Sequence, residues 1–507
     1  MLKGRALVTN WQDIGQQLKK AQVVLEPSAR LIPDSRQVTK GDIFIATKGF
    51  DQDGASYINK ALDLGAVAVL VSDACDEHLY NKLSNVVLVP DLERKIANIA
   101  KEFYIKDQSV SMPVIAVTGT NGKTSISHLL AQLSQICLQQ ESAVIGTIGT
   151  GSINDLQPSS NTTPGVTEIY RLISQFLVKN YGSLTMEVSS HALEQGRIEG
   201  LDLDVAIFTN LTLDHLDYHG TMEAYFEAKA KLFNEYQPKC AVINVDDKYG
   251  RRLADMVANQ TRVIAYGQSD NVKAYSDYVY IRSFECHTHG LSIDIEWQVI
   301  GAKEECFLQL PIYGEFNCLN LAAVFATALT LNWPIVAGHF SQLKPVPGRL
   351  ELFVKPNLPV AVVDYAHTPD ALEQSLLAVR KHLSGELYVI FGCGGERDVS
   401  KRPIMGKLAQ EHADHVIITN DNPRTEDEDK IIADIEAGMT GSNYQIIKSR
   451  KEAIELALQS ATASDAILIA GKGHETYQVI GTESIDYNER DYVEKLMATF
   501  TNHGGMI

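Results

Sequence analysis

The sequence has few cysteines and no long apolar run, and each absence excludes a class of protein. Its seven cysteines are scattered along 507 residues, and none forms the C-x-x-C pair typical of zinc or redox sites. That pattern argues against a disulfide framework and suits a reducing compartment. No stretch reaches the ~18 consecutive apolar residues of a membrane helix, and the first residues lack the apolar segment of a secretory signal. We therefore expect a cytoplasmic protein without membrane insertion.

Positive charge is also scarce in this chain. The 63 aspartates and glutamates outnumber the 45 lysines and arginines, which gives a formal net charge of −18. Phosphate backbones and anionic membranes need a positive face, so binding to nucleic acids or membrane surfaces is disfavoured. A small anionic substrate remains compatible with this charge, because it needs only a few local arginines. The apolar content of 45% is that of a globular protein, and the length predicts several domains.

The clearest positive signal is a Gly-rich turn between a predicted strand and a predicted helix. The apolar run Val114–Val117 leads into Gly119-Thr120-Asn121-Gly122-Lys123-Thr124, and apolar residues then recur at helical spacing. Backbone N–H groups in such a turn can cradle phosphates, the lysine neutralises their charge, and the threonine hydroxyl can hold Mg²⁺. Val117 occupies the first glycine position of the strict phosphate-loop pattern. An ordinary strand-to-helix turn is the alternative, but the context favours ATP or GTP binding.

Three regions follow from the pattern of apolar runs and turns, and together they predict an α/β fold. The N-terminal region alternates short strands with a helix, which is typical of a small α/β domain. The middle region contains the Gly-rich turn, a strand and a β-rich stretch. Its boundaries are a polar linker and a stiff proline segment. The predicted elements are strands 42–46, 67–71 and 205–209, helix 58–64, loop 49–54, linker 107–113, β-rich stretch 272–310 and boundary 345–348.

The third region repeats one pattern, an apolar strand that runs straight into a polar loop, with helices between. This is typical of a parallel, doubly wound, Rossmann-like sheet, whose ligands bind beyond the carboxyl ends of the strands. The predicted strands are 360–363, 387–391, 415–419 and 466–470. We therefore predict three domains: a small N-terminal α/β domain at 1–110, a central phosphate-loop mononucleotide-binding domain at 111–347, and the doubly wound domain at 348–507.

Acidic and histidine side chains gather in the middle region. Glu187 follows an apolar stretch at a predicted strand end, and the segment Asn210–His219 contains two histidines and two aspartates before a helix with Glu227. One or two carboxylates with ATP phosphates suffice for Mg²⁺, which keeps several of its waters. A solvated loop with helix-capping aspartates is the alternative reading of the same residues.

Three charged, Gly-containing loops follow strands of the third region. They are Gly392–Asp398, Asp421–Arg424 and Gly471–Glu475. Arginines can pair with a carboxylate in bidentate fashion, while acidic groups can hold an ammonium. An amino acid is the ligand that suits this mixture, with Arg397 and Arg424 for its carboxylate and Asp421 and Glu475 for its ammonium. Solvated α/β turns are the alternative.

With these residues assembled, the chain resembles the Mur ligases, the ATP-dependent ligases of bacterial peptidoglycan synthesis. The resemblance extends from Asp34-Ser35-Arg36 to Tyr477, nearly the whole length. The phosphate loop and the three charged loops belong to it. The other matching motifs are Asn161-Thr162-Thr163, Met186–His191, Asp214–Gly220, Gly314–Asn317 with Asn320, Pro347-Gly348-Arg349 and Asp364–Pro369.

The resemblance implies roles for individual residues. ATP would be bound by Gly119, Thr120, Asn121, Gly122, Lys123, Thr124, Asn320, Arg349 and Asp364. Catalysis would depend on Lys123, Glu187, His215 and Lys229, with magnesium held by Thr124, Glu187, His215 and, if carbamylated, Lys229. The UDP-linked substrate would contact Pro33, Ser35, Asn161, Thr162, Thr163, Ser189, Gln195 and Arg197. The amino acid would contact Arg397, Asp421, Asn422, Pro423, Arg424, Gly471 and Glu475. Pro33, Phe50 and Asp51 depart from the family's commoner residues around uracil.

The reaction implied by the resemblance is ATP-driven amide formation with Mg²⁺. It would add meso-2,6-diaminopimelate to the D-glutamyl γ-carboxylate of UDP-N-acetylmuramoyl-L-alanyl-D-glutamate through an acyl phosphate. In this family an arginine at the position of Arg424 accompanies diaminopimelate, whereas lysine-adding relatives usually carry another residue. The partners would be these small molecules, and we expect a monomer.

Other functions remain as alternatives. Within the family these are a lysine-adding ligase and, more remotely, a folylpolyglutamate synthase. From another class, the chain could be an ATP-hydrolysing regulator on the same fold. An NAD-dependent oxidoreductase is disfavoured, because Gly392–Gly395 lacks the glycine spacing and the acidic residue ~20 positions on that dinucleotide binding requires.

Overall fold

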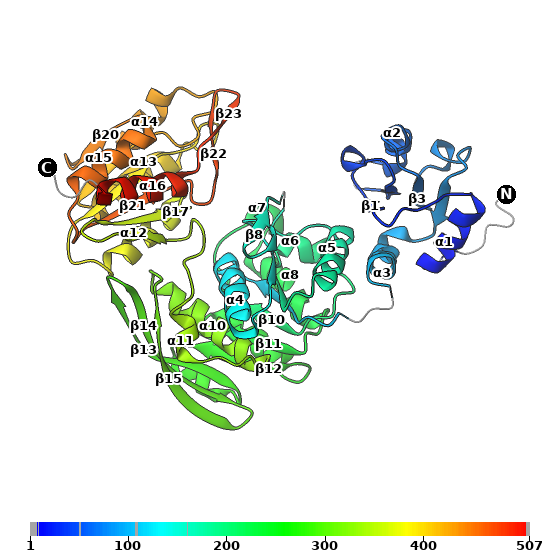
Figure 1. Ribbon diagram of the computed structural model, residues 1–507, viewed down its shortest axis with the longest axis horizontal. Helices are drawn as coiled ribbons and strands as arrows, with labels where there is room; N and C mark the ends of the chain where they lie inside the picture. Colours follow the sequence, from blue (N-terminus) through cyan, green and yellow to red (C-terminus); the bar gives the residue numbers. More distant parts are fainter. Residues whose placement is uncertain (1–7, 9, 50–51, 107–109, 160, 503–507) are drawn as a thin grey trace. The chain divides into compact units, whose positions relative to one another are not determined.

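The computed structural model describes residues 8, 10–49, 52–106, 110–159 and 161–502 (Figure 1). Phe50, Asp51 and the first three residues of the expected linker 107–113 lie outside this range. The chain forms two compact units that are not continuous in sequence. The first unit contains residues 1–118, 140–206 and 213–239, and the second contains 119–139, 207–212 and 240–507. Within the described residues, no helix combines the length and apolarity needed to span a bilayer.

The N-terminal part of the first unit is a four-stranded parallel sheet with helices, as the alternation of its sequence predicts. Its strands are hydrogen-bonded in chain order. Apolar residues of β2 and β3 are buried against those of α2. The elements are α1 (Trp11–Lys20), β1 (Leu31–Ile32), β2 (Ile43–Ala46), α2 (Ile58–Asp63), β3 (Ala68–Ser72), β4 (Val86–Val89) and α3 (Leu92–Tyr104).

The rest of the first unit is built on buried parallel strands. β9 (Ser183–Glu187) lies between β5 (Val114–Thr118) and β6 (Ser142–Ile145), and Val117 of β5 pairs with Glu187 of β9. An antiparallel pair, β7 and β8, continues from β6. Parallel strands end at a common edge, so Glu187 lies at the carboxyl edge of this sheet. The remaining elements are β7 (Thr150–Ser152), β8 (Asp155–Gln157), α5 (Val166–Val178), α6 (Ser190–Glu194), α7 (Leu216–His219) and α8 (Met222–Asn234). The division between the units falls within β10 (Val205–Phe208).

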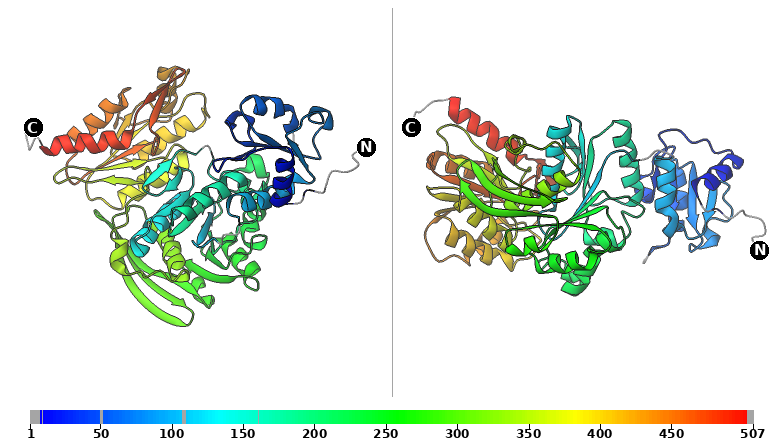
Figure 2. Two further views of the ribbon diagram at one scale, coloured as in Figure 1. Left: turned by 45° about the vertical axis from the view of Figure 1, so that its right-hand side comes forward. Right: turned by 90° about the horizontal axis from the view of Figure 1, so that it is seen from below.

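The second unit begins with the helix that follows the Gly-rich turn, α4 (Lys123–Leu138). Three parallel strands, β11 to β13, are continued by two antiparallel ones, β14 and β15. Figure 2 shows the last three of these, in green, as long strands side by side. The β-rich stretch expected at 272–310 is therefore present. The elements are β11 (Cys240–Asn244), α9 (Lys248–Val257), β12 (Arg262–Gly267), β13 (Tyr278–His287), β14 (Gly290–Val299), β15 (Ala302–Leu310), α10 (Phe316–Thr330) and α11 (Ala337–Phe340).

The C-terminal part of the second unit is a doubly wound sheet, as its sequence predicts. The strand order is β16-β17-β21-β18-β19-β20, and every pair except β16 with β17 is parallel. The elements are β16 (Glu351–Phe353), β17 (Val360–Asp364), α12 (Pro369–Arg380), β18 (Leu387–Phe391), α13 (Lys401–His412), β19 (His415–Ile418), α14 (Glu428–Glu436), β20 (Tyr444–Ile446), α15 (Arg450–Ser460), β21 (Ala466–Ala470), β22 (Tyr477–Ile480), β23 (Glu483–Asp486) and α16 (Glu489–Asn502).

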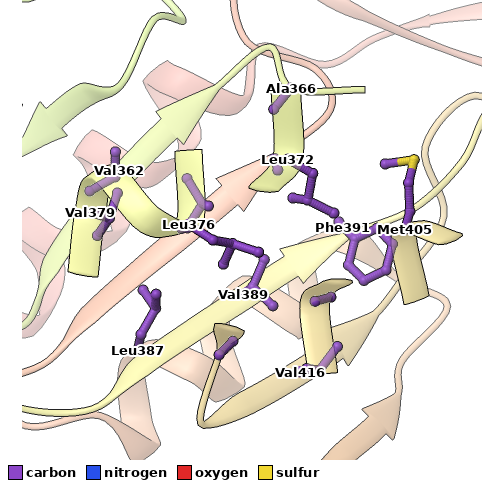
Figure 3. Close-up of a cluster of buried hydrophobic side chains, with 14 of the residues drawn as sticks. Val362, Ala366, Leu372, Leu376, Val379, Leu387, Val389, Phe391, Met405 and Val416 are labelled. Atoms are coloured by element: carbon purple, nitrogen blue, oxygen red, sulfur yellow. The ribbon is translucent and has the colours of Figure 1, made fainter. Parts of the chain in front are cut away.

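Alternate residues of these strands build two cores, one on each face of the sheet. One core holds residues of α12, α13 and α14, and the other holds residues of α15 and α16. Figure 3 shows Leu372 and Leu376 of α12 directed toward Phe391 and Val389 of β18. Because helices cover both faces, only the strand ends and the loops that follow them are free to contact a ligand.

Candidate active site

The Gly-rich loop lies between β5 and α4, the strand–loop–helix context that its sequence predicts. Gly119 and Gly122 have positive φ angles of 144° and 87°. A Cβ at Gly119 would overlap the Thr209 hydroxyl, and one at Gly122 would come within 2.6 Å of Asn320 Oδ1. Both positions therefore require glycine, because of the backbone conformation and because neighbouring atoms approach closely. Lys123 Nζ donates to the carbonyl oxygens of Gly119 and Thr120, at 2.8 and 2.7 Å, so its ammonium lies over the loop.

A second segment, residues 209–212, supports this loop. The N–H groups of Thr120 and Asn121 donate to the backbone and side-chain oxygens of Asn210, both at 2.9 Å. The Thr209 hydroxyl donates to Asn121 O at 2.6 Å. Two consecutive amides of the turn are thus used to fix its shape. Any phosphate cradle must therefore depend on the groups nearer the start of α4, where the helix dipole is positive.

The expected nucleotide-binding residues Asn320, Arg349 and Asp364 also lie in the second unit. Asn320 Nδ2 donates to Asn317 Oδ1 at 2.8 Å on α10. The Arg349 guanidinium lies 5.2 Å from the centre of the Tyr365 ring. Asp364 is buried and accepts from Leu350 N at 2.8 Å, and also from Ala366 N and the Ser375 hydroxyl. Its carboxylate therefore fixes the backbone beside Arg349.

Three side chains near Arg349 were not selected by sequence reasoning. The His474 and Tyr365 rings are 4.9 Å apart. His128, on α4, is buried. Burial is the largest cause that lowers the pKa of His128, to about 3, and the charges of His474 and Arg349 lower it further. Burial and the charge of Arg349 also lower the pKa of His474, to about 4. Both histidines are therefore neutral at pH 7.

In the first unit, Glu187 is fully buried at the end of β9 and is oriented by threonines. Its Oε1 accepts from Thr147 N at 2.9 Å and its Oε2 from the Thr147 hydroxyl at 3.1 Å. The Thr147 and Thr162 hydroxyls are 3.0 Å apart, and the Thr163 hydroxyl donates to Glu187 O at 2.9 Å. A carboxylate has about four acceptor sites, so a group of this kind is chemically suited to bind a cation.

The expected contacts of the UDP-linked substrate surround this carboxylate. Ser189 N donates to the Thr163 hydroxyl at 3.2 Å, and Arg197 Nη1 donates to Thr163 O at 2.7 Å. Arg197 also pairs with Gln195 Oε1 through Nε and Nη2, at 3.0 and 2.7 Å. The structure thus brings together Glu187, Thr162, Thr163, Ser189, Gln195 and Arg197. Asn161 precedes them on the same loop. Pro33 and Ser35 lie in the N-terminal sheet region, where Ser35 is buried.

His215 and Lys229 both lie near the ring of Tyr225. The His215 ring lies 6.1 Å from the Tyr225 ring and 5.2 Å from that of His191, and Lys229 Nζ lies 4.6 Å from the Tyr225 ring centre. Lys229 is buried. Within the described residues, no three His, Cys, Asp or Glu side chains form a ready-made cation cage. Mg²⁺ does not require one, since it commonly uses one or two carboxylates with waters and phosphates.

The three charged loops of the C-terminal sheet come together. A Cβ at Gly394 would lie 3.0 Å from Arg424 Nη1 and 3.7 Å from Arg397 Cγ, so both arginines lie beside this glycine. A Cβ at Gly471 would come within 2.6 Å of Asp421 Oδ2. The structure therefore brings two arginines to one loop and an aspartate against the third. This is the mixture of charges that a zwitterion requires.

A lysine missed by sequence reasoning joins these loops. The Lys472 side chain is fully buried, and its Nζ donates to Asn422 Oδ1 at 3.1 Å and to Glu475 Oε2 at 2.9 Å. Asn422 Nδ2 donates to the same Glu475 oxygen at 3.1 Å, and Val479 N donates to Asn422 Oδ1 at 2.9 Å. Glu475 is thus oriented by Lys472 and Asn422, and its charge raises the pKa of Tyr477.

Comparison with known proteins gives matches along most of the chain. Residues 31–104 match the catalytic domain of the Mur ligase family, residues 117–328 the Mur ligase middle domain, and residues 348–473 the glutamate ligase domain of Mur ligases. A UDP-N-acetylmuramoyl-L-alanyl-D-glutamate–2,6-diaminopimelate ligase from Vibrio vulnificus is 42% identical over 474 residues, which cover 92% of this chain and 93% of that protein.

Solved structures give the same picture. The structure of a ligase with the same name has a TM-score of 0.70 and 35% identity, and the match covers 93% of this chain and 95% of that one. A MurF ligase from Thermotoga maritima, solved in complex with ADP, shares the fold with a TM-score of 0.59 at 19% identity. That match covers 94% of this chain and 97% of the other.

Proposed function

This chain belongs to the Mur ligase family, and we propose that it uses ATP to join meso-2,6-diaminopimelate to the D-glutamyl γ-carboxylate of UDP-N-acetylmuramoyl-L-alanyl-D-glutamate. The product serves peptidoglycan synthesis and hence cell growth and division. The observation that carries the choice of amino acid is the position of Arg397 and Arg424 beside Gly394. Two arginines that approach the same glycine suit a substrate with a second carboxylate, which lysine lacks.

ATP binding is assigned to Gly119–Thr124, Asn320, Arg349 and Asp364. The positive φ angles of Gly119 and Gly122 and the position of Lys123 Nζ over the loop support this assignment. Lys123 would shift from loop carbonyls to phosphate oxygens, which are stronger acceptors for an ammonium. Asp364 would act mainly by fixing the backbone next to Arg349.

The residues that would hold Mg²⁺ are Thr124, Glu187, His215 and a carbamylated Lys229. Glu187 suits this role because its carboxylate is buried and already oriented by Thr147. Lys229 is buried beside Tyr225, and the neutral amine of a lysine is the form that adds CO₂. The new N–C bond forms with loss of a proton and leaves an anionic carbamate. When bound, Mg²⁺ would offset the negative charge between two approaching anions.

The reaction proceeds in two steps without a protein nucleophile. The γ-carboxylate of the UDP-linked substrate attacks the γ-phosphorus, forming an acyl phosphate and releasing ADP. The neutral amine of diaminopimelate then attacks the acyl carbon, loses a proton, and expels inorganic phosphate. The protein's contribution is positioning and charge stabilisation. Arg197, with Thr162, Thr163, Ser189 and Gln195, would orient the first substrate, while the three C-terminal loops would present the amine.

Three domains fit these tasks, at residues 1–110 for the UDP-sugar, 111–347 for ATP and 348–507 for the amino acid. Closure would bring the amine to the acyl phosphate and exclude water that would hydrolyse it. We place the hinge at 345–348. Identical small-angle scattering profiles with and without ATP and substrates would count against this hinge.

The deciding experiment is a coupled assay with purified protein, UDP-muramoyl dipeptide, ATP, Mg²⁺ and a panel of amino acids. The proposal expects phosphate release and a tripeptide product, identified by mass, with diaminopimelate. Product with lysine would indicate the lysine-adding relative, and ATP hydrolysis without acceptor would indicate a regulator. We further propose a cytoplasmic monomer, which cell fractionation and size-exclusion chromatography with light scattering would test.

A further inference from the structure

The three charged loops at 392–398, 421–424 and 471–475 are called the amino-acid loops below. The first two contact each other closely, and their backbones are strained. Gly395 N donates to Asn422 O at 2.9 Å, and Arg424 Nη1 donates to Gly395 O at 2.8 Å. A Cβ at Gly395 would overlap the carbonyl oxygen of Pro423. Glu396 and Arg424 both have left-handed backbones, with φ of 55° and 54°. Residues with a Cβ adopt this conformation only where surrounding contacts hold them there.

Arg402, on α13, contacts the first of these loops and the residue that follows the second. Its side chain is fully buried. Nη1 and Nη2 donate in parallel to the two carboxylate oxygens of Glu426, each at 2.8 Å. Nη2 also reaches Gly394 O at 3.3 Å, which lies in the first loop. Nη1 makes a further bond to Asp434 Oδ2, at 2.9 Å, on α14.

Glu426 completes the connection between the loops. It lies two residues after Arg424, just beyond the second loop, and its Oε2 accepts from Glu396 N of the first loop at 2.8 Å. The guanidinium of Arg402, followed by the Glu396 amide, lowers the pKa of Glu426 to about 2. One ion pair therefore contacts Gly394 and Glu396, on either side of Gly395, and also anchors the segment that carries Arg424.

We infer that Arg402 and Glu426 form a loop clamp, a pair of positioning residues that sets the spacing of Arg397 and Arg424 and so determines selectivity for an amino acid with a distal carboxylate. The inference rests on the proposed function. Arg402 is buried beneath the loops and acts through their backbone. Bidentate carboxylate recognition depends on angle as well as distance, so a small shift of either loop weakens it.

Arginine is suited to this place for a geometric reason. Its planar fork donates two parallel bonds to Glu426 and still reaches Gly394 O and Asp434. The single ammonium of a lysine preserves the charge but cannot span these acceptors at once. The loop clamp therefore requires the geometry of the guanidinium in addition to its positive charge.

The test uses two isosteric variants of the same arginine's partners. Glu426→Gln removes a carboxylate that bonds both Arg402 and the Glu396 amide, whereas Asp434→Asn removes one that lies on α14, outside both loops. We expect Glu426→Gln to raise KM for diaminopimelate by about 10- to 100-fold. Asp434→Asn should change that KM by less than about 3-fold, and both should leave KM for ATP nearly unchanged.

Selectivity provides a readout that a merely structural role would not move. The ratio of kcat/KM for diaminopimelate to that for lysine should fall in Glu426→Gln and stay near the wild-type value in Asp434→Asn. Equal KM and selectivity changes in the two variants would overturn the inference. If Glu426→Gln does not fold, Arg402→Lys decides by the same criteria. Absence of a diaminopimelate product with the wild-type protein would instead refute the proposed function itself.

Discussion

We propose that the phosphate loop and the amino-acid loops both bind anions, but that they do so with different groups. The phosphate loop depends mainly on its backbone. Two of its glycines have positive φ, and two of its amides donate to Asn210, which fixes the shape of the loop; Lys123 adds a single cationic side chain. The amino-acid loops depend on charged side chains, several of them buried, such as Lys472 and Arg402. A backbone cradle fits any phosphate, whereas side chains can be exchanged to fit another substrate. We therefore expect chemistry to depend on the first region and selectivity on the second.

The largest effect is expected from a substitution in the phosphate loop. Lys123→Ala should lower kcat by about 10³-fold or more, because a cation that offsets developing phosphoryl charge is lost. Initial rates of phosphate release would measure this, with a thermal melt to verify the fold. The control is Lys407→Ala, which removes an exposed lysine paired with Glu411 on α13. A variant at position 123 with normal turnover would contradict the ATP assignment.

The next largest effect is expected from a substitution in the amino-acid loops, which leaves the phosphate loop unchanged. Arg424→Ala should raise KM for diaminopimelate by about 10²-fold, since a charge-assisted pair with the distal carboxylate is lost. KM for ATP should not change. Arg380→Ala is the matched control, because Arg380 pairs with Asp414 through an ion pair of 2.7 Å that lies outside the loops. If Arg424→Ala keeps full preference for diaminopimelate over lysine, selectivity lies elsewhere.

The smallest expected effect concerns His128 on α4, the helix that follows the phosphate loop. Burial and, to a smaller degree, His474 and Arg349 lower the pKa of His128. Its pKa falls from 6.5 to about 3 on folding. Between these values the unfolded chain binds a proton that the folded chain does not, so stability falls as pH falls below 6.5. From pH 6.5 to 4.5 this histidine should remove about 2 kcal/mol from the free energy of unfolding.

Urea unfolding of the wild type and His128→Gln over this pH range measures the difference. The variant should lose about 2 kcal/mol less than the wild type. Glu426 does not interfere, because its pKa falls from 4.5 to about 2, and the stability it contributes is lost only below pH 4.5. Parallel pH profiles for the two proteins would show that His128 does not titrate differently on folding.

Much of this architecture is readable from the sequence, because strands buried on both faces are continuous apolar runs. β18 spans Leu387–Phe391, the predicted strand, and α4 begins at Lys123, as the glycine turn predicts. The charged loops were also visible, because parallel strands place their carboxyl ends at one edge. What the pattern could not give is how distant segments meet, such as Arg397 and Arg424 at Gly394.

Lys472, Arg402 and Thr147, which sequence reasoning missed, each have at least one partner far away in the chain. Lys472 is 50 residues from Asn422, and Arg402 is 24 residues from Glu426. The residues next to a lysine in the sequence do not reveal whether it is buried or solvated, so only the folded structure distinguishes the two cases. Thr147, which orients Glu187 from 40 residues away, is a further case.

The position of β21 has a consequence for synthesis of the chain on the ribosome. This strand is made after β16 to β20, yet it is inserted between β17 and β18, pairing Val360 with Ala466 and Leu387 with the same residue. A nascent chain that ends before residue 466 therefore exposes two unpaired strand edges in the middle of its sheet. Contacts of such long sequence separation form slowly. We expect this sheet to fold only once β21 has left the ribosome, and to be the part of the chain that most requires chaperones.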